Sequence, residues 1–178
     1  MPTTERATIK CTATFSDNSE HRYSLTRVWD KNKPQALVIS ISPSEAFNVE
    51  MDLTTILIQN NLHNQNFGGF CLVNLISKIG VDAKKVKETK DLWNKETDQE
   101  IVKRAGEADS IIVAWGSFAN TRQQYREREE TVLNLLKPFE DKTFEITDGA
   151  ERFFLHPLTP AIRNGWVLSK LKTQEKAK

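Results

Sequence analysis

The sequence predicts an α/β fold, a three-layer sandwich in which a mainly parallel central sheet lies between two layers of helices. The first observation is a set of short, continuously apolar runs, which indicate strands buried on both faces of a sheet. These runs are Ala36–Ile39, Phe70–Val73, Ile111–Ala114 and Phe153–Leu155. The second observation is that helix-length segments separate them, as the crossovers between parallel strands require.

An N-terminal antiparallel β-hairpin is expected over about residues 7–29. Apolar and polar residues alternate along both halves of this segment, and Asp17-Asn18 supplies turn chemistry between them. The hairpin either adds to the main sheet or covers its edge.

Helices are expected at four places in the rest of the chain. Asp52 is a candidate N-cap for a helix that begins beside it. The lysine-rich residues 82–88 favour a short exposed helix. Thr97–Glu100 have the pattern of a capping box that opens another helix. A long helix follows over about residues 117–137.

The C-terminal part is expected to add one further strand. Thr143–Ile146 forms it, and Asp148-Gly149 makes a turn into the apolar run Phe153–Leu155. The charged residues 173–178 are expected to fray.

Size and composition indicate a single α/β domain, residues 1–178. The formal charge of +1 gives no global attraction to nucleic acid or membrane, so a basic patch has to be local. Without a secretory signal or transmembrane run, the cytoplasm is the expected compartment. Cys11 and Cys71 fall in apolar strand patterns and make no ligand spacing with the histidines, so neither a metal nor a cofactor is expected.

Polar residues follow the end of each apolar run. In parallel sheets the ligand crevice lies beyond the carboxyl ends of the strands. Four such ends would bring Ser42, Asn74, Trp115 and His156 to one rim, and that rim is the expected site.

A series of short motifs follows one after another along the chain: Arg22–Leu25, Arg27–Trp29, Pro43-Ser44, Asp52–Thr54, Val73–Leu75, Ala114–Gly116 and His156–Leu158. In this order they resemble the bacterial domain-of-unknown-function 1643 family. The order and spacing of the motifs carry the resemblance, which covers residues from about 22 to 158. Where the family usually has Asn-Pro-Ser, this chain has Ser42-Pro43-Ser44.

More distantly, the layout is similar to the uracil-DNA glycosylase superfamily, which implies a fold of that kind. By position, Ser42-Pro43-Ser44 matches the loop that activates water and Asn74 the residue that reads the base. Trp115-Gly116 matches the third strand end, and His156-Pro157 the loop that stabilises the leaving base. The resemblance implies a bacterial or phage domain that recognises a nucleobase, a nucleotide or nucleic acid such as DNA. If the domain is an enzyme, the resemblance implies that it hydrolyses an N-glycosidic bond.

The candidate catalytic residues are His156, Ser42 and Glu45. His156 can donate a hydrogen bond to a departing base, or it caps a strand end. Ser42 can orient water or phosphate but has no charge to offset a cation. Three nearby carboxylates, Glu45, Glu50 and Asp52, can supply this charge, and the other role of Glu45 is to cap a helix start.

The candidate ligand-binding residues are Pro43, Ser44, Asn74, Trp115 and Gly116. The backbone after Pro43 can offer N–H groups to an anion. The Asn74 amide carries donors and an acceptor that suit a base edge or loop backbone. Trp115 either stacks on a base or packs in the core, and Gly116 lets the chain turn closely.

The charged side chains do not decide which kind of partner the protein binds. The lysines of one segment can follow phosphates or form a solvated face: Lys78, Lys84, Lys85, Lys87 and Lys90. Arg122, Arg126 and Arg128 alternate with glutamates and indicate an exposed, ion-paired face. The alternative function is a non-catalytic ligand-binding or protein-interaction module of the phage or host-defence type, with a protein partner on the hairpin.

Overall fold

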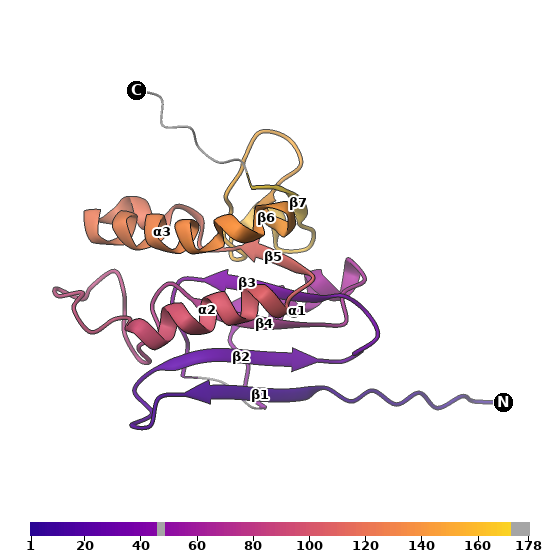
Figure 1. Ribbon diagram of the computed structural model, residues 1–178. Coiled ribbons are helices and arrows are strands. Elements are labelled where there is room, and N and C mark those ends of the chain that lie inside the picture. The colour runs from indigo at the N-terminus through magenta and orange to yellow at the C-terminus, as the bar shows by residue number, and fades with distance from the viewer. Residues whose placement is uncertain (46–48, 172–178) are drawn as a thin grey trace.

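A computed structural model describes residues 1–45 and 49–171 and contains a seven-stranded sheet (Figure 1). The strand order is β1-β2-β4-β3-β5-β6-β7. The strands are β1 (Lys10–Phe15), β2 (Arg22–Val28), β3 (Gln35–Ser40), β4 (Gly69–Asn74), β5 (Ser110–Val113), β6 (Thr143–Thr147) and β7 (Val167–Lys170). The first three apolar runs of the sequence therefore form β3, β4 and β5, at the centre of the sheet.

The sheet is mixed, so the expectation of a mainly parallel sheet is wrong. The four central strands β4, β3, β5 and β6 are parallel to their neighbours within this group. The pairs β1–β2, β2–β4 and β6–β7 are antiparallel. The expected hairpin is confirmed as β1 and β2, and it extends the sheet because β2 pairs with β4.

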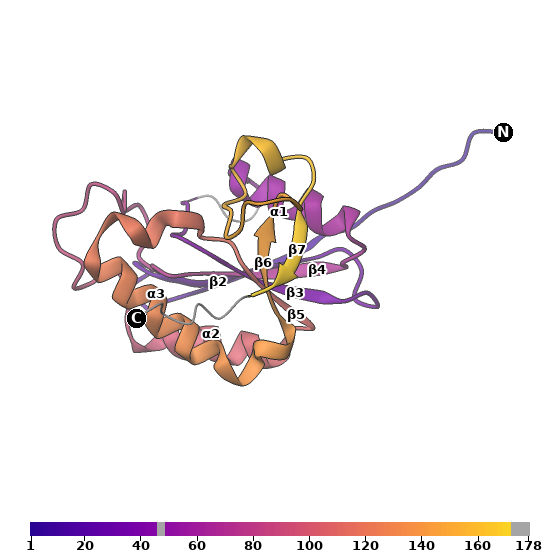
Figure 2. The same ribbon diagram turned by 90° about the horizontal axis from the view of Figure 1, so that it is seen from above.

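Helices cover both faces of the sheet, which gives the expected three layers (Figure 2). The α-helices are α1 (Leu53–Asn64), α2 (Lys95–Glu107) and α3 (Gln123–Leu136). Helix α1 lies on one face, and α2 and α3 lie on the other (Figure 2). Alternate residues of β3 enter the two cores: Leu37 and Ile39 pack in one cluster, Ala36 and Val38 in the other.

Two helix starts test the expected caps. Asp52 is confirmed as the N-cap of α1, since its side chain accepts a hydrogen bond from the Thr55 backbone N–H. The capping box of α2 is formed by Asn94 and Thr97, so the expected box at Thr97–Glu100 is wrong by one turn. The Asn94 amide oxygen accepts from the Thr97 N–H, and the Thr97 hydroxyl accepts from the Asn94 N–H.

The long helix expected over residues 117–137 is divided. A 3₁₀ helix, η1 (Gly116–Thr121), precedes α3, and a second, η2 (Lys137–Lys142), follows it. Arg122 separates η1 from α3 because its backbone is extended, with φ −151° and ψ 153°. Arg128 also contradicts the expected exposed face, since it is 2% exposed.

Residues 82–88 form turns instead of the expected helix. Asp82 closes a single turn, in which its carbonyl accepts from the Lys85 and Val86 N–H groups. The Arg122 guanidinium donates to the carbonyls of Lys84 and Val86. A tertiary contact therefore holds carbonyls that a longer helix would use internally.

Phe153–Leu155 is not a strand, which overturns the fourth buried run. Phe154 has φ +58°, a left-handed conformation that interrupts an extended chain. Phe153 is 43% exposed, and β7 takes the place beside β6. A third 3₁₀ helix, η3 (Pro160–Ile162), lies between this loop and β7. The expected frayed tail, residues 173–178, lies outside the described residues.

Candidate functional site

A cleft of about 450 Å³ lies at the carboxyl ends of β3 and β4. After β3 the chain enters α1 on one face of the sheet, and after β4 it leads to α2 on the other (Figure 2). Neighbouring parallel strands whose connections diverge in this way open a crevice between them. The start of β2, Phe118, and the loops around residues 81–84 and 156–158 complete the walls.

Asn74 is the last residue of β4, and its side chain lines the cleft. It is 2% exposed, and neither its amide oxygen nor its amide nitrogen has a hydrogen-bond partner among the described residues. A buried polar group without a partner costs about 1–3 kcal/mol. The amide therefore presents an unused donor and an unused acceptor to the cleft.

His156 lines the same cleft, although it comes from a loop after β6 and not from the expected strand end. The Leu158 backbone N–H donates to its Nδ1 at 3.1 Å. Burial, and then the nearby charge of Lys84, lower the pKa of the imidazole from 6.5. The neutral ring accepts at Nδ1, so it carries its proton on Nε2 and offers a donor there.

The loop after β3 forms a third wall, to which Ser42, Pro43 and Ser44 all contribute. Two groups hold this loop in place. The Arg22 guanidinium donates to the Ser44 carbonyl at 3.1 Å, and the Ser44 hydroxyl donates to the Asp52 carboxylate at 2.8 Å. The loop is therefore fixed between the start of β2 and the N-terminus of α1.

Asp52 places an ionised carboxylate in the cleft lining. Burial opposes its ionisation, but hydrogen bonds from the Thr55 N–H, the Thr55 hydroxyl and the Ser44 hydroxyl, with the Arg22 charge, hold its pKa below 3.8. Its Oδ2 accepts from both hydroxyls at 2.8 Å, and Oδ1 accepts from the Thr55 N–H at 3.0 Å. The site thus holds a stable negative charge beside a buried arginine.

Three of the candidate residues lie outside the cleft lining. Glu45 is exposed. Trp115 is 1% exposed and packs edge-on against Phe154, with its indole N–H donating to Glu129 at 2.7 Å. Gly116 is buried beside the backbone of His156, so it supports the histidine from behind.

The lysine-rich segment contributes one lysine to the cleft, Lys84. Helix α3 anchors this part of the segment, because the Tyr125 hydroxyl donates to the Ala83 carbonyl and Arg122 donates to the Lys84 carbonyl. Two other lysines are held by carboxylates: Lys78 lies 3.6 Å from Glu20, and Lys85 lies 3.2 Å from Asp82.

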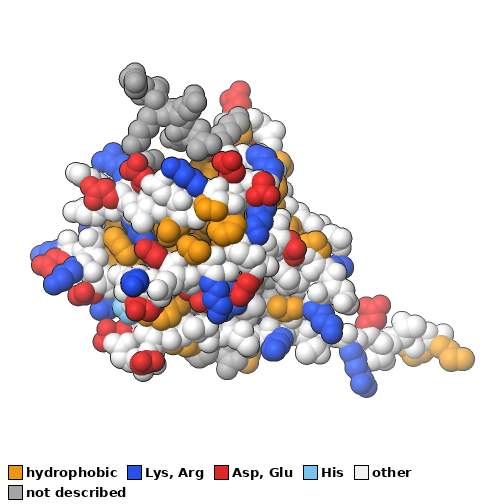
Figure 3. Space-filling model, viewed as in Figure 1, with side chains coloured by type: hydrophobic (Ala, Val, Ile, Leu, Met, Phe, Trp, Pro, Cys, Tyr) orange, Lys and Arg blue, Asp and Glu red, His pale blue; other side chains and the backbone are white. Residues whose placement is uncertain are grey.

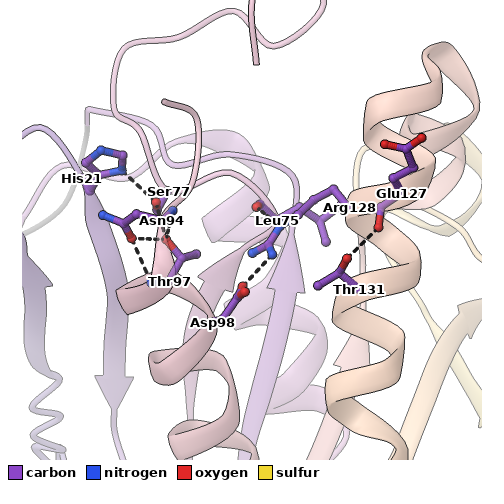
Figure 4. Close-up of polar contacts among 9 residues, drawn as sticks. All are labelled: His21, Leu75, Ser77, Asn94, Thr97, Asp98, Glu127, Arg128 and Thr131. Atoms are coloured by element: carbon purple, nitrogen blue, oxygen red, sulfur yellow. Dashed lines mark hydrogen bonds and ion pairs between the residues drawn. The ribbon is translucent and has the colours of Figure 1, made fainter. Parts of the chain in front are cut away.

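The backbone that follows Asn74 is fixed from two sides (Figure 4). On one side, Arg128 reaches from α3 and donates to the Leu75 carbonyl at 2.8 Å, and it also pairs with Asp98. On the other side, the Ser77 hydroxyl is hydrogen-bonded to His21 at 2.8 Å and to Thr97 at 2.7 Å (Figure 4). Asn74 therefore projects from a rigid support.

Sequence reasoning missed one charged member of the site, Arg22. It named Lys84 only as one of five lysines that can follow phosphates, and Asp52 as a helix cap and one of three nearby carboxylates. Both Arg22 and Asp52 lie within motifs that carry the family resemblance. Their place in these motifs was the available signal, because a charged residue that belongs to a motif is more readily explained by a role in a site than by the alternation of a strand. The sequence did not distinguish Lys84 from the other lysines of its segment.

Within residues 1–45 and 49–171, no group of three or more His, Cys, Asp or Glu side chains is arranged to hold a metal ion. Cys11 and Cys71 are free, and burial raises the pKa of the Cys71 thiol to about 11. No helix in the described part of the chain is long and apolar enough to cross a membrane.

A family model described as a protein of unknown function, DUF1643, matches residues 22–158. The match begins at the first residue of β2 and ends at Leu158, so it spans every segment that lines the cleft. Comparisons with curated proteins and with solved structures found no match. Since the family model covers well over half of the chain, the protein belongs to the DUF1643 family.

Proposed function

We propose that the cleft recognises a nucleobase and that the protein hydrolyses the N-glycosidic bond joining this base to its sugar. The observation that carries the proposal is the buried Asn74 amide, unpartnered among the described residues, in the same cleft as the Nε2 donor of His156. A ligand that satisfies these groups recovers hydrogen bonds that the protein alone leaves unmade.

A nucleobase fits the Asn74 amide because its edge carries a donor beside an acceptor. The side-chain amide offers the complementary pair, an acceptor oxygen and a donor nitrogen. A ligand without this edge leaves the buried amide unpaired, which is how such sites discriminate strongly between similar molecules. The anchored residues Leu75 and Ser77 hold the backbone that follows Asn74 in place.

His156 suits the role of stabilising the leaving base. When the bond between the sugar carbon and the base nitrogen breaks, the electron pair goes to the base, and negative charge spreads to its carbonyl oxygen. A neutral imidazole with its proton on Nε2 can donate to that oxygen. Burial and Lys84 favour the neutral ring by lowering its pKa.

Asp52 suits the second role in the reaction, which is to offset positive charge on the sugar; of the carboxylates Glu45 and Asp52, only Asp52 lines the cleft. Its ionised carboxylate can stabilise the positive charge that develops on the sugar and can orient the attacking water. The water oxygen bonds to the sugar carbon, and its proton passes to the departing base or to solvent. Ser42 lines the cleft and can hold this water with its hydroxyl.

The parallel strands lie side by side in the order β4-β3-β5-β6. The cleft lies at the ends of β3 and β4, where the chain leaves these two strands toward opposite faces of the sheet. A fold of this kind serves many functions, so the proposed activity depends on the residues of the cleft and not on the fold.

The direct test is incubation with nucleosides and with oligonucleotides that contain uracil or other altered bases, with chromatography for the released base. Wild-type protein should release base. Asp52→Asn should bind the same compound without releasing it, because it keeps the hydrogen-bonding shape but loses the charge. Base release that is unaffected by either Asp52→Asn or His156→Asn would contradict the proposed mechanism.

Binding without turnover is the second candidate, and one observation favours it. Three hydrogen bonds already occupy the Asp52 carboxylate, which leaves little capacity for a water. In that case a nucleobase compound raises the melting temperature of the protein, and no base is released on long incubation. Asn74→Ala should remove the rise in melting temperature for a binder and an enzyme alike.

A further inference from the structure

The charges that line the cleft are balanced. Two cationic side chains, Arg22 and Lys84, and two carboxylates, Asp52 and Asp82, contribute to the described lining. His156 adds no charge when it is neutral. Proteins that bind nucleic acid instead carry a stripe of Lys and Arg that follows successive phosphates. The cleft walls do not supply such a stripe.

The two cations of the cleft are not equivalent. Arg22 is 2% exposed and already holds the Ser44 carbonyl, with Asp52 nearby as its counter-charge. Lys84 is exposed and forms no ion pair with a carboxylate of the described residues. One ammonium group is therefore available at the opening of the cleft, enough to pair with one phosphate.

The neighbouring surface extends this charge only in part, since Lys87 and Lys90 are exposed and form no ion pair with a carboxylate of the described residues. Lys78 and Lys85, on either side of Lys84 in the sequence, are paired with carboxylates. Blue and red side chains are interspersed on the face shown in Figure 3, and the whole chain has a formal charge of only +1. A cleft of about 450 Å³ lies within the range of about 300–1,000 Å³ typical of small-molecule sites.

We infer that the natural ligand is a free nucleoside monophosphate held whole in the cleft, and not a base within a nucleic acid. This inference rests on the proposed function, since it takes the nucleobase to lie at Asn74 and His156. Lys84 then contacts the single phosphate.

The experiment is a binding titration of the full chain at several salt concentrations. The probes are the five common nucleosides, their 5′-monophosphates, and single-stranded and duplex 12-mers that contain all the bases tested. At least one monophosphate should bind more tightly than its nucleoside, with a slope of log K against log [salt] of about −1 or shallower. Oligonucleotides should bind no more tightly than that monophosphate.

Three variants test whether Lys84 contacts the phosphate. Lys84→Ala should weaken binding of the monophosphate about two- to fivefold, as expected for an exposed charge pair, and weaken binding of the nucleoside by a smaller factor. Lys85→Ala is the matched control, because Lys85 neighbours it but does not line the cleft. Asn74→Ala should abolish binding of both compounds.

The possible results separate this inference from the proposed function. If oligonucleotides bind at least about tenfold more tightly, with a slope steeper than about −3 and loss on Asn74→Ala, the free-nucleotide inference is overturned while nucleobase recognition stands. If a monophosphate binds no better than its nucleoside, the phosphate contact is overturned. If no probe binds in a way that depends on Asn74, both proposals fail.

Discussion

Gly116 lies directly against His156. A Cβ atom added at residue 116 would come within 3.0 Å of the His156 Cβ and 3.1 Å of its backbone nitrogen. Gly116 also has φ +60°, a conformation that side chains disfavour. Gly116 therefore positions the imidazole by close backbone packing, although neither Gly116 nor Trp115 lines the cleft.

Gly116→Ala should destabilise the protein by about 1–2 kcal/mol from the left-handed conformation alone, and it should weaken ligand binding because His156 has to move. Gly106→Ala in α2 is the control, since a Cβ there meets no atom within 4 Å. This control should stabilise the protein by about 0.5–1 kcal/mol. Urea unfolding measures both, and equal effects of the two changes would contradict the packing argument.

Asn74→Ala should leave the free energy of unfolding nearly unchanged or raise it by about 1 kcal/mol, because it removes a buried amide without partners. Asn61 is the matched comparison, 3% exposed on α1. Its amide donates to the Leu57 and Arg163 carbonyls and accepts from the Trp166 N–H. Asn61→Ala should therefore cost about 2–4 kcal/mol in the same urea titrations. A similar loss for Asn74→Ala would indicate a structural role for that amide.

Arg128→Ala should cost about 3–5 kcal/mol, because it leaves the Leu75 carbonyl without its donor and Asp98 without its partner. It also removes the contact of the guanidinium with the Trp93 ring, at 5.2 Å. Arg126→Ala on the exposed face of the same helix should stay within about 0.5 kcal/mol. Thermal unfolding provides the comparison, and a small effect at Arg128 would contradict the support shown in Figure 4.

Glu129 should make the protein less stable as the pH rises. Burial raises the pKa of this carboxyl above 4.5, although the hydrogen bond from Trp115 opposes the shift. Between 4.5 and the higher folded pKa, the folded protein keeps a proton that the unfolded chain has released, so stability falls through this window. Glu129→Gln keeps an acceptor for Trp115, so its stability relative to wild type should increase with pH across the window and then level off. Denaturation at a series of pH values measures this difference.

His156 should have the opposite dependence. Its folded pKa lies below 6.5, so below that pH the unfolded chain binds a proton that the folded protein does not, and stability falls as the pH drops. His156→Asn should remove this contribution and the Nε2 donor while keeping an acceptor for the Leu158 N–H. His21, whose pKa is also lowered, is common to both proteins and cancels in the comparison. A wild-type advantage that does not shrink from about pH 7 to about pH 5 would contradict it.

Local sequence patterns were enough to predict much of the fold. The hairpin, the three central strands and the Asp52 cap each follow from alternation, continuous apolar runs or a side chain beside free N–H groups. The same runs predicted where the polar residues after β3 and β4 would meet. Placing Ser42 and Asn74 in one cleft needed only the parallel direction of these two strands.

The remaining features depend on contacts between distant segments. Phe153–Leu155 has a strand's composition, but β7 pairs with β6 and leaves Phe154 in a left-handed turn. Arg128 follows the charge pattern of an exposed face, yet Leu75 and Asp98, far away in sequence, bind it inside. The periodicity of a sequence does not reveal such partners, because an alternating charge pattern does not indicate which distant residues pack against the helix.

Because β2 runs against β4, its first residue, and not its last, reaches the edge of the sheet where the parallel strands end. Arg22 thereby becomes part of the cleft wall, whereas β1 contributes nothing to it. Of the two strands in the N-terminal hairpin, the inner one therefore closes the cleft, while the outer one only extends the sheet beyond it.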